Sequence, residues 1–98
     1  MNNVKYISII ITTYNREKNV LEILKKIQKQ IGYKDGLEVI ICDSFSKASL
    51  KIMSYKKMFH NLNISYFNLK INHQAYKRNY GASKANGKYL IFLDDDCM

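Results

Sequence analysis

The chain has no apolar run long enough to cross a membrane, and it has only two cysteines. The β-branched run at Ile7–Ile11 is too short even for the core of a signal peptide. Cys42 and Cys97 form no metal-binding spacing and offer no disulfide framework. Each one ends or follows an apolar segment, so we expect buried, reduced thiols of a cytoplasmic protein.

Acidic residues are missing from the whole segment between Ser44 and Leu93. The same segment holds nine basic side chains: Lys47, Lys51, Lys56, Lys57, Lys70, Lys77, Arg78, Lys84 and Lys88. The chain has a formal net charge of +8, which favours polyanions such as nucleic acid, anionic lipid headgroups or nucleotide phosphates. No stacking-aromatic motif or basic recognition helix accompanies the charge, so we expect no nucleic-acid partner.

What is present is an alternation of two periodicities. Apolar, β-branched runs predict four strands, at Tyr6–Thr12, Leu37–Cys42, Ile64–Leu69 and Tyr89–Leu93. Two of the segments between them carry apolar residues at helical spacing: Val20, Leu24, Ile27 and Ile31 in the first, and Ala48, Ile52, Tyr55 and Phe59 in the second.

A third helix is predicted over roughly His73–Asn86, directly before the last strand. Its small residues Ala75, Asn79 and Ala82 would allow it to pack closely on a sheet. Gly87 suits the C′ position, where a glycine commonly ends a helix.

The resulting order is β-α-β-α-β-α-β, with no repeat, linker or low-complexity tract. This order predicts a single α/β domain over residues 1–98, with a Rossmann-like, open, mainly parallel sheet and helices on both faces. The expected strand order is 3-2-1-4. In such sheets ligands bind beyond the carboxyl ends of the strands, where the strand order reverses.

Three of the four predicted strands end in polar residues: Thr12–Asn15, Asp43-Ser44, and Asp94-Asp95-Asp96. Adjacent carboxylates repel one another, so the triplet needs a cation or hydrogen-bond donors unless it is a solvated acidic loop. Hard cations such as Mg²⁺ and Mn²⁺ take oxygen ligands, and with ligand phosphates they need only one or two protein carboxylates. The three clusters together indicate a site for a base, a sugar and metal-bridged phosphates.

Four motifs, in order, carry a resemblance to a known family. They are Ile9-Ile-Ile-Thr-Thr-Tyr-Asn15, Glu38-Val-Ile-Ile-Cys-Asp-Ser44, Lys77-Arg-Asn-Tyr-Gly81, and Ala85-Asn-Gly-Lys-Tyr-Leu-Ile-Phe-Leu-Asp-Asp-Asp96. Essentially the whole chain resembles the donor-binding half of inverting family 2 glycosyltransferases with the GT-A fold. The resemblance implies transfer of a sugar from a nucleoside-diphosphate sugar to an acceptor hydroxyl of a saccharide or glycolipid, with help from a divalent metal, Mn²⁺ or Mg²⁺.

The resemblance also implies roles for the carboxylate triplet, which matches the family's DXD motif. Asp96 would coordinate the metal held by the donor diphosphate, while Asp94 would approach the ribose and share in binding the metal. Asp95 would contact the sugar or only tune its neighbours.

Four further residues match the family's nucleotide-binding positions. Thr12 and Tyr14 would flank the nucleotide, Asp43 would face the base, and Arg78 would lie near the phosphates. The residues themselves leave alternatives open: Tyr14 could pack on the first helix, Asp43 could cap the second, and Arg78 could pair with the carboxylates in the unliganded protein.

The chain departs from the family pattern at several places. Thr12 stands where a proline is common, and the chain has no proline at all. The usual acidic-acidic-glycine-serine turn reads Asp43-Ser44-Phe45-Ser46 here, and Gln74 stands where a glycine is frequent. The family's acceptor half and its general base would lie beyond residue 98. We therefore expect a donor-binding domain truncated before the acceptor half, without sugar transfer of its own.

Rival classes remain. A haloacid dehalogenase-type phosphatase also has an Asp-x-Asp after a hydrophobic strand, but there the motif normally opens the fold. A non-catalytic nucleotide- or metal-binding module is the main alternative, and a basic nucleic-acid-binding domain is the third. For the complete enzyme we expect a cytoplasmic location at the membrane face. For this chain we expect self-association through the exposed edge of the last strand, Tyr89–Leu93.

Overall fold

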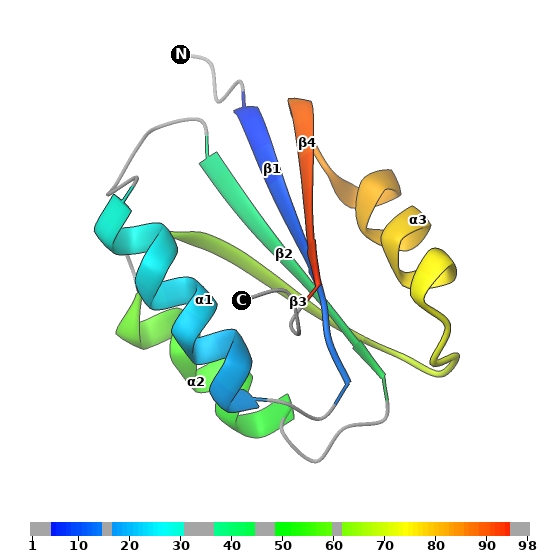
Figure 1. Cartoon of the computed structure of the whole chain (residues 1–98), viewed down its shortest axis with the longest axis horizontal. Helices are drawn as coiled ribbons and strands as arrows, with labels where there is room; N and C mark the ends of the chain where they lie inside the picture. Colours follow the sequence, from blue (N-terminus) through cyan, green and yellow to red (C-terminus); the bar gives the residue numbers. More distant parts are fainter. Residues whose placement is uncertain (1–4, 15–16, 31–36, 45–48, 60–61, 95–98) are drawn as a thin grey trace.

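The computed structural model describes residues 5–14, 17–30, 37–44, 49–59 and 62–94. Four strands alternate with three helices, as the sequence predicts (Figure 1). The elements in chain order are β1 (Lys5–Thr12), α1 (Glu17–Gln30), β2 (Leu37–Ser44), α2 (Ser49–Met58), β3 (Asn63–Leu69), α3 (Gln74–Lys84) and β4 (Gly87–Asp94).

The four strands form one parallel sheet in the order β3-β2-β1-β4, which confirms the predicted order. The chain passes outward from β1 to β2 and β3, and then crosses back through α3 to place β4 on the free side of β1. The strand order therefore reverses between β1 and β4. In the register of this pair Thr12 lies opposite Asp94, so the two polar strand ends are direct neighbours.

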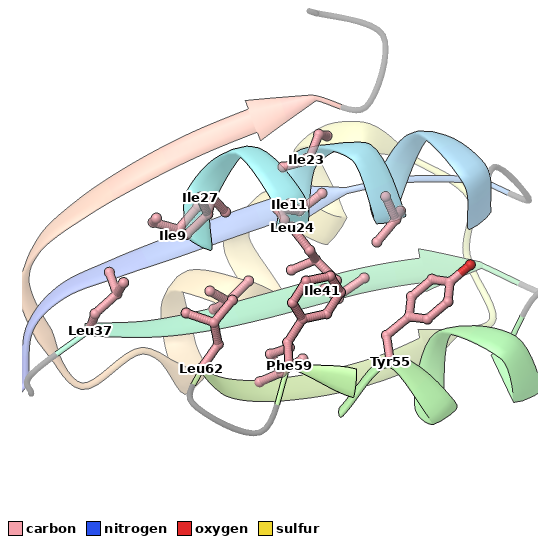
Figure 2. Close-up of a cluster of buried hydrophobic side chains, with 13 residues drawn as sticks. Ile9, Ile11, Ile23, Leu24, Ile27, Leu37, Ile41, Tyr55, Phe59 and Leu62 are labelled. Atoms are coloured by element: carbon pink, nitrogen blue, oxygen red, sulfur yellow. The ribbon is translucent and has the colours of Figure 1, made fainter. Parts of the chain in front are cut away.

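One face of the sheet is covered by α1 and α2 (Figure 1). Ile9 and Ile11 from β1, together with Val39 and Ile41 from β2, bury their side chains against these helices. Figure 2 shows how the helices complete this core. Their buried side chains include the predicted Val20, Leu24, Ile27, Tyr55 and Phe59, while Ile31 and the side chains of Ala48 and Ile52 lie outside what the structure describes.

The opposite face is covered by α3, which packs on Ile10, Ile40 and Cys42. The prediction of which α3 residues face the sheet was largely wrong. Ala75 and Asn79 are exposed, and only Ala82 contributes partly to the contact, whereas the buried residues are Lys77 and Gly81. A side chain at Gly81 would place its Cβ 2.6 Å from Cγ2 of Ile10. The absence of a Cβ at Gly81 therefore allows the close approach of α3.

Gly87 is not the C′ residue of α3. The helix ends at Lys84 with Ala85 as its C-cap, and Gly87 is the first residue of β4. A Cβ at Gly87 would lie 2.6 Å from Oγ and 2.7 Å from the backbone nitrogen of Ser8. This glycine is thus required by the close contact between β4 and β1 and not by the end of a helix.

β4 lies at the edge of the sheet and exposes four consecutive large side chains. Tyr89, Leu90, Ile91 and Phe92 are between 39% and 67% exposed. The sequence correctly predicts an apolar strand here. The apolar composition of this strand suggests burial on both faces, but among the described residues both faces of β4 are partly exposed. Within the described residues, no helix is both long and apolar enough to span a membrane.

Candidate functional site

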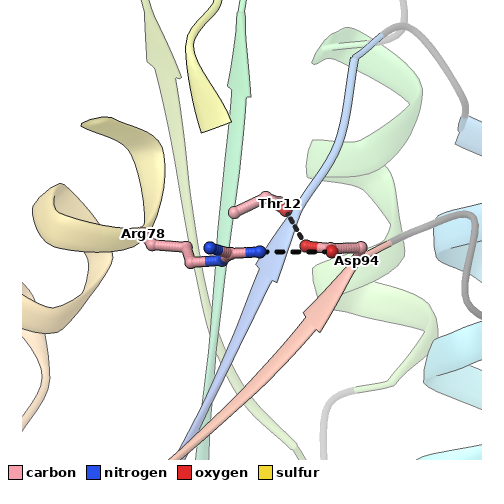
Figure 3. Close-up of polar contacts among 3 residues, drawn as sticks. All are labelled: Thr12, Arg78 and Asp94. Carbon is pink, nitrogen blue, oxygen red and sulfur yellow. Dashed lines mark hydrogen bonds and ion pairs between the residues drawn. The ribbon is translucent and has the colours of Figure 1, made fainter. Parts of the chain in front are cut away.

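The centre of the candidate site is a contact between the ends of β1 and β4. The hydroxyl of Thr12 donates a hydrogen bond of 2.7 Å to Oδ1 of Asp94 (Figure 3). The bond follows from the register of the two strands, which places both side chains on the face that α3 covers. It joins residues 82 positions apart in the sequence at the point where the strand order reverses.

Arg78 completes this contact from α3. Its Nη2 atom lies 3.4 Å from Oδ2 of Asp94, as Figure 3 shows. The hydrogen bond from Thr12, a side-chain hydrogen bond from Gln74, and the charge and hydrogen bond of Arg78 lower the pKa of Asp94 against the opposing effect of burial. Asp94 is therefore an ionised carboxylate at neutral pH.

Thr12 is buried, whereas Arg78 and Asp94 are partly accessible to water. The side chains of Arg78 and Asp94 are 42% and 22% exposed. A single ion pair with this much access to water contributes little to stability. Arg78 does pair with a carboxylate in this ligand-free structure, as one of the alternatives held, and the long, exposed contact leaves both groups able to exchange partners.

Asp43 lies at the end of β2 and is completely buried. Its Oδ1 accepts a hydrogen bond of 2.8 Å from the backbone of Ser44, and its Oδ2 accepts one of 2.9 Å from the hydroxyl of Tyr66. Asn68 donates in turn to the Tyr66 hydroxyl at 3.0 Å. Because α2 begins only at Ser49, Asp43 is not its N-cap residue.

Tyr14 follows β1 at the rim of the sheet and is 50% exposed. Its ring centroid lies 5.9 Å from Nζ of Lys77 on α3. Lys77 itself is buried, and its ammonium donates to the backbone carbonyl of Thr13 at 2.8 Å and to Oδ1 of Asn72 at 2.9 Å. The aromatic ring of Tyr14, which is predicted to flank a nucleotide, therefore lies beside the ammonium group of Lys77 on α3.

The structure thus joins three of the predicted site residues directly: Thr12, Arg78 and Asp94. Tyr14 lies two residues beyond Thr12 on the same rim. Asp43 lies on β2, which β1 separates from β4. Asp95 and Asp96, as well as Cys97, lie outside the described residues.

Sequence reasoning missed three residues that shape this rim: Lys77, Gln74 and Tyr66. The four-residue spacing from Lys77 to Gly81 was a usable signal, because it places the lysine on the same side of α3 as a glycine that approaches the sheet. No sequence signal identified Tyr66, since its role depends on the pairing of β3 with β2.

No group of three or more histidine, cysteine, aspartate or glutamate side chains that could hold a metal occurs in the described part of the chain. At the contact between β1 and β4, Asp94 offers an ionised oxygen ligand of the kind that Mg²⁺ and Mn²⁺ accept. One carboxylate fits a cation whose other ligands are water and phosphate oxygens, and does not make a complete protein site.

Comparisons with known proteins indicate a family for this chain. The family model described as "Glycosyl transferase family 2" matches residues 8–98. The poly(ribitol-phosphate) β-N-acetylglucosaminyltransferase TarS of Staphylococcus aureus is 31% identical over 90 residues, which are 91% of this chain and 16% of that protein. A Campylobacter jejuni GalNAc(5)-diNAcBac-PP-undecaprenol β-1,3-glucosyltransferase is 34% identical over 96 residues, covering 92% of this chain and 29% of its own length.

Solved structures show the same fold. The crystal structure of S. aureus TarS 1-349 in complex with UDP-GlcNAc superposes with a TM-score of 0.78 at 31% identity, covering 93% of this chain and 26% of that one. The mannosyltransferase PcManGT from Pyrobaculum calidifontis, in complex with GDP-Man and Mn²⁺, gives a TM-score of 0.81 at 24% identity. It covers 92% of this chain and 27% of its own, and supports the fold alone.

The chain thus spans less than a third of the length of these relatives, although each match takes in nearly all of it. The family model covers the Thr12–Asp94 contact, Arg78 and the aspartate triplet. The chain belongs to glycosyl transferase family 2.

Proposed function

We propose that the chain is the donor-binding part of a glycosyltransferase, which holds a nucleoside-diphosphate sugar while the sugar is transferred to an acceptor hydroxyl. The observation that carries the proposal is the Thr12–Asp94–Arg78 contact at the reversal of strand order. A carboxylate and a guanidinium side by side at this position can bind a hydroxyl-rich ribose and a diphosphate. The solved TarS complex with UDP-GlcNAc, at 31% identity, makes UDP the first nucleotide to test.

In this proposal the ion pair between Arg78 and Asp94 is the resting state of the site. The 3.4 Å contact is longer than a strong charge-assisted hydrogen bond, so its loss costs little. A bound diphosphate offers Arg78 several anionic oxygens in place of one, and it frees an oxygen of Asp94 for the ribose or for a cation. Thr12 keeps the other oxygen of Asp94 in place during this exchange.

We further propose that Asp94 and Asp96 bind Mn²⁺ or Mg²⁺ together with the donor diphosphate. A divalent cation would act as a Lewis acid and stabilise negative charge on the leaving diphosphate. Asp94 would then serve as one hard oxygen ligand, and Thr12 would hold its carboxylate in the required orientation. Asp95 would contact the sugar.

The nucleoside would lie along the rim between Tyr14 and Asp43. Tyr14 has an exposed ring available for stacking. Asp43 would face the base, and for this the Tyr66 hydroxyl that covers its Oδ2 would have to share or leave that oxygen.

The acceptor, a saccharide or a glycolipid, and the general base that deprotonates it are assigned to a further part of the enzyme. We therefore expect the 98-residue chain to bind a donor without transferring its sugar. The cytoplasmic location and membrane-face contact of the complete enzyme remain part of the same proposal.

Calorimetry with UDP, in the presence and absence of Mn²⁺, tests the donor site. We expect Mn²⁺ to strengthen UDP binding to the wild-type chain. Arg78→Gln and Asp96→Ala should each weaken the Mn²⁺-dependent binding about tenfold or more, because each removes a charged contact to the diphosphate or its metal. Lys84→Gln, which changes an exposed lysine elsewhere on α3, is the matched control and should bind as the wild type does. Equal affinities for wild type and Asp96→Ala, or tight metal-independent binding of an oligonucleotide, would contradict the proposal.

A further inference from the structure

Lys77 is a buried cation that the proposed donor chemistry does not use. Only 4% of its surface is exposed, and it lies in the first half of α3, directly before Arg78. Burying an ammonium is costly unless oxygen atoms replace its water. The structure supplies such oxygens from two segments far apart in the sequence, the carbonyl of Thr13 and the side chain of Asn72.

Packing of α3 does not explain this lysine. The helix approaches the sheet through Gly81, whose missing Cβ leaves room for Ile10. Its C-terminal end is fixed by the bond from the Asn86 backbone to Glu38, 2.6 Å long. A methionine at position 77 would fill a similar volume without the cost of burying a charge, so the ammonium is present for the bonds that it makes.

Those bonds act on the rim of the candidate site. The Thr13 carbonyl belongs to the peptide unit that leads into Tyr14, and the backbone N–H of Thr13 is itself held by the carbonyl of Cys42 at 3.0 Å. Thr13 is therefore held by β2 at its N–H and by Lys77 at its carbonyl, while Nζ of Lys77 lies 5.9 Å from the centroid of the Tyr14 ring. Asn72 is held at the same time, just before α3 begins.

The charge of Lys77 also reaches the end of β2. Burial raises the pKa of the Cys42 thiol to about 11, and the nearby ammonium of Lys77 partly opposes this rise. The end of β1, the end of β2 and the segment before α3 therefore all lie within reach of one cation.

We propose that Lys77 is a positioning residue of the donor site, which holds the Thr13–Tyr14 rim of β1 and Asn72 in the arrangement that receives the nucleoside. This inference rests on the proposed donor function. Lys77 acts by preorganisation: a rim that is ordered before binding does not have to be ordered by the ligand, and the affinity is higher by that difference. It does not act as a phosphate ligand, since its ammonium is buried on Thr13 and Asn72.

The test compares two lysines of the same helix that each stand near a tyrosine ring. Lys77→Met removes the buried cation, and Lys84→Met removes an exposed one whose Nζ is 5.4 Å from the Tyr80 ring centroid. Titrations followed by NMR measure the affinities of both variants and the wild type for UDP and for uridine. Lys77→Met should weaken both ligands by the same factor, about tenfold, the equivalent of one hydrogen bond to a charged group. Lys84→Met should leave both affinities unchanged, and Lys77→Arg should restore part of the loss.

A loss confined to UDP would mean that the charge of Lys77 acts on the phosphates, and would overturn the positioning role. Unchanged affinities in Lys77→Met, measured below its melting temperature, would do the same.

A second measurement needs no ligand. Amide hydrogen exchange at Thr13 and Tyr14 should accelerate in Lys77→Met and not in Lys84→Met, relative to amides in the centre of β2. If the wild type binds neither UDP nor uridine, a uridine-nucleotide donor is wrong, and the exchange data still decide whether Lys77 holds this rim. Unchanged exchange at both residues would refute it.

Discussion

Two carboxylates on the same face of the sheet, Glu38 and Asp94, make similar hydrogen bonds but differ in their other partners and in their exposure to water. Each accepts a hydrogen bond from a hydroxyl of β1: Ser8 donates to Glu38 at 2.6 Å, and Thr12 donates to Asp94 at 2.7 Å. Glu38 lies near the amino end of its strand and Asp94 at the carboxyl end of its own.

The two carboxylates differ in their second hydrogen-bond partner. Oε2 of Glu38 also accepts from the backbone of Asn86 at 2.6 Å, and the residue is 5% exposed. Ser8 accepts from the backbone of Gly87 at 2.8 Å, so the turn between α3 and β4 is tied to β1 and β2 by fixed groups. Asp94 is paired instead with Arg78, a long side chain that is 42% exposed.

This difference shows how one fold can provide both a fixed polar contact and, at the proposed donor site, a contact that a ligand can open. At the amino ends, backbone donors cannot leave without unfolding the turn, so the polar contact is purely structural. At the carboxyl ends, the partner is a flexible, solvated side chain, so a ligand can replace it. In the proposed function, the same kinds of group therefore stabilise the fold at the end of α3 near Asn86 and bind the donor at the end that carries Arg78.

The largest expected effect is the removal of the buried carboxylate. Glu38→Ala leaves the Ser8 hydroxyl and the Asn86 N–H without their partner, and we expect it to lower the free energy of unfolding by about 3 kcal/mol. Asp94→Ala, in the exposed contact, should cost less than about 1 kcal/mol. Urea unfolding of both variants measures the two values. Equal losses would mean that the two contacts do not differ as described.

Adding a methyl group at Gly87, next to the Ser8–Glu38 contact, tests how rigid that end of the sheet is. A Cβ at Gly87 would meet the backbone of Ser8 at 2.7 Å, and backbone cannot move aside, so Gly87→Ala should destabilise the chain by about 2 kcal/mol. Gly81→Ala is the comparison: its Cβ would lie 2.6 Å from Cγ2 of the buried Ile10, so side chains also have to shift, but its nearest contacts are side-chain atoms and alanine favours the helix. Thermal unfolding should rank Gly87→Ala as the less stable. If Gly81→Ala were the less stable variant, the packing of α3 on the sheet would tolerate an added methyl group less well than the contact between β4 and β1.

A further prediction concerns self-association of the chain through the exposed edge strand β4. β4 has exposed, apolar side chains, and within the described residues it pairs with a strand on one side only. These features predict self-association that rises with salt, since salt screens the repulsion of a chain with a net charge of +8. Sedimentation velocity at low and moderate ionic strength measures this. Ile91→Lys should keep the chain monomeric, whereas Ile71→Lys, which changes an equally exposed residue outside the strands, should not. A wild-type monomer at both ionic strengths would show that this edge does not pair.

The smallest effect concerns pH. The pKa of Asp94 is lowered in the folded chain, so its contribution to stability is complete above the pKa of the unfolded chain and is lost as the pH falls through the folded value. The stability difference between wild type and Asp94→Asn should therefore shrink as the pH is lowered from about 5 to about 2. Chemical unfolding at several pH values measures it. A difference that stays constant with pH would mean that Asp94 is not held as a carboxylate by its neighbours.

The sequence alone determined the alternation of strands and helices, the parallel sheet and its strand order. These features depend on local periodicity and on the general rules that parallel strands follow. The Asp94 triplet and the ordered motifs also indicated the family and the end of the sheet at which ligands bind. The residues Thr12, Arg78 and Asp94 were predicted one by one from their places in those motifs.

Only the tertiary structure decided which of these residues touch. The Thr12–Asp94 bond depends on the register between β1 and β4, and a shift of one residue would turn Asp94 to the other face of the sheet. The burial of Lys77 and the exposure of Asn79 depend on the rotation of α3 about its axis, which the contact between Gly81 and the sheet fixes. The sequence pattern assigned Gly87 to the end of a helix. Its actual constraint is the close approach of β1 at Ser8, which lies 79 residues away in the sequence. Register and helix rotation are set by contacts between distant segments, so local periodicity does not fix them, and the spacing of Lys77 and Gly81 is only a partial signal for the rotation of α3.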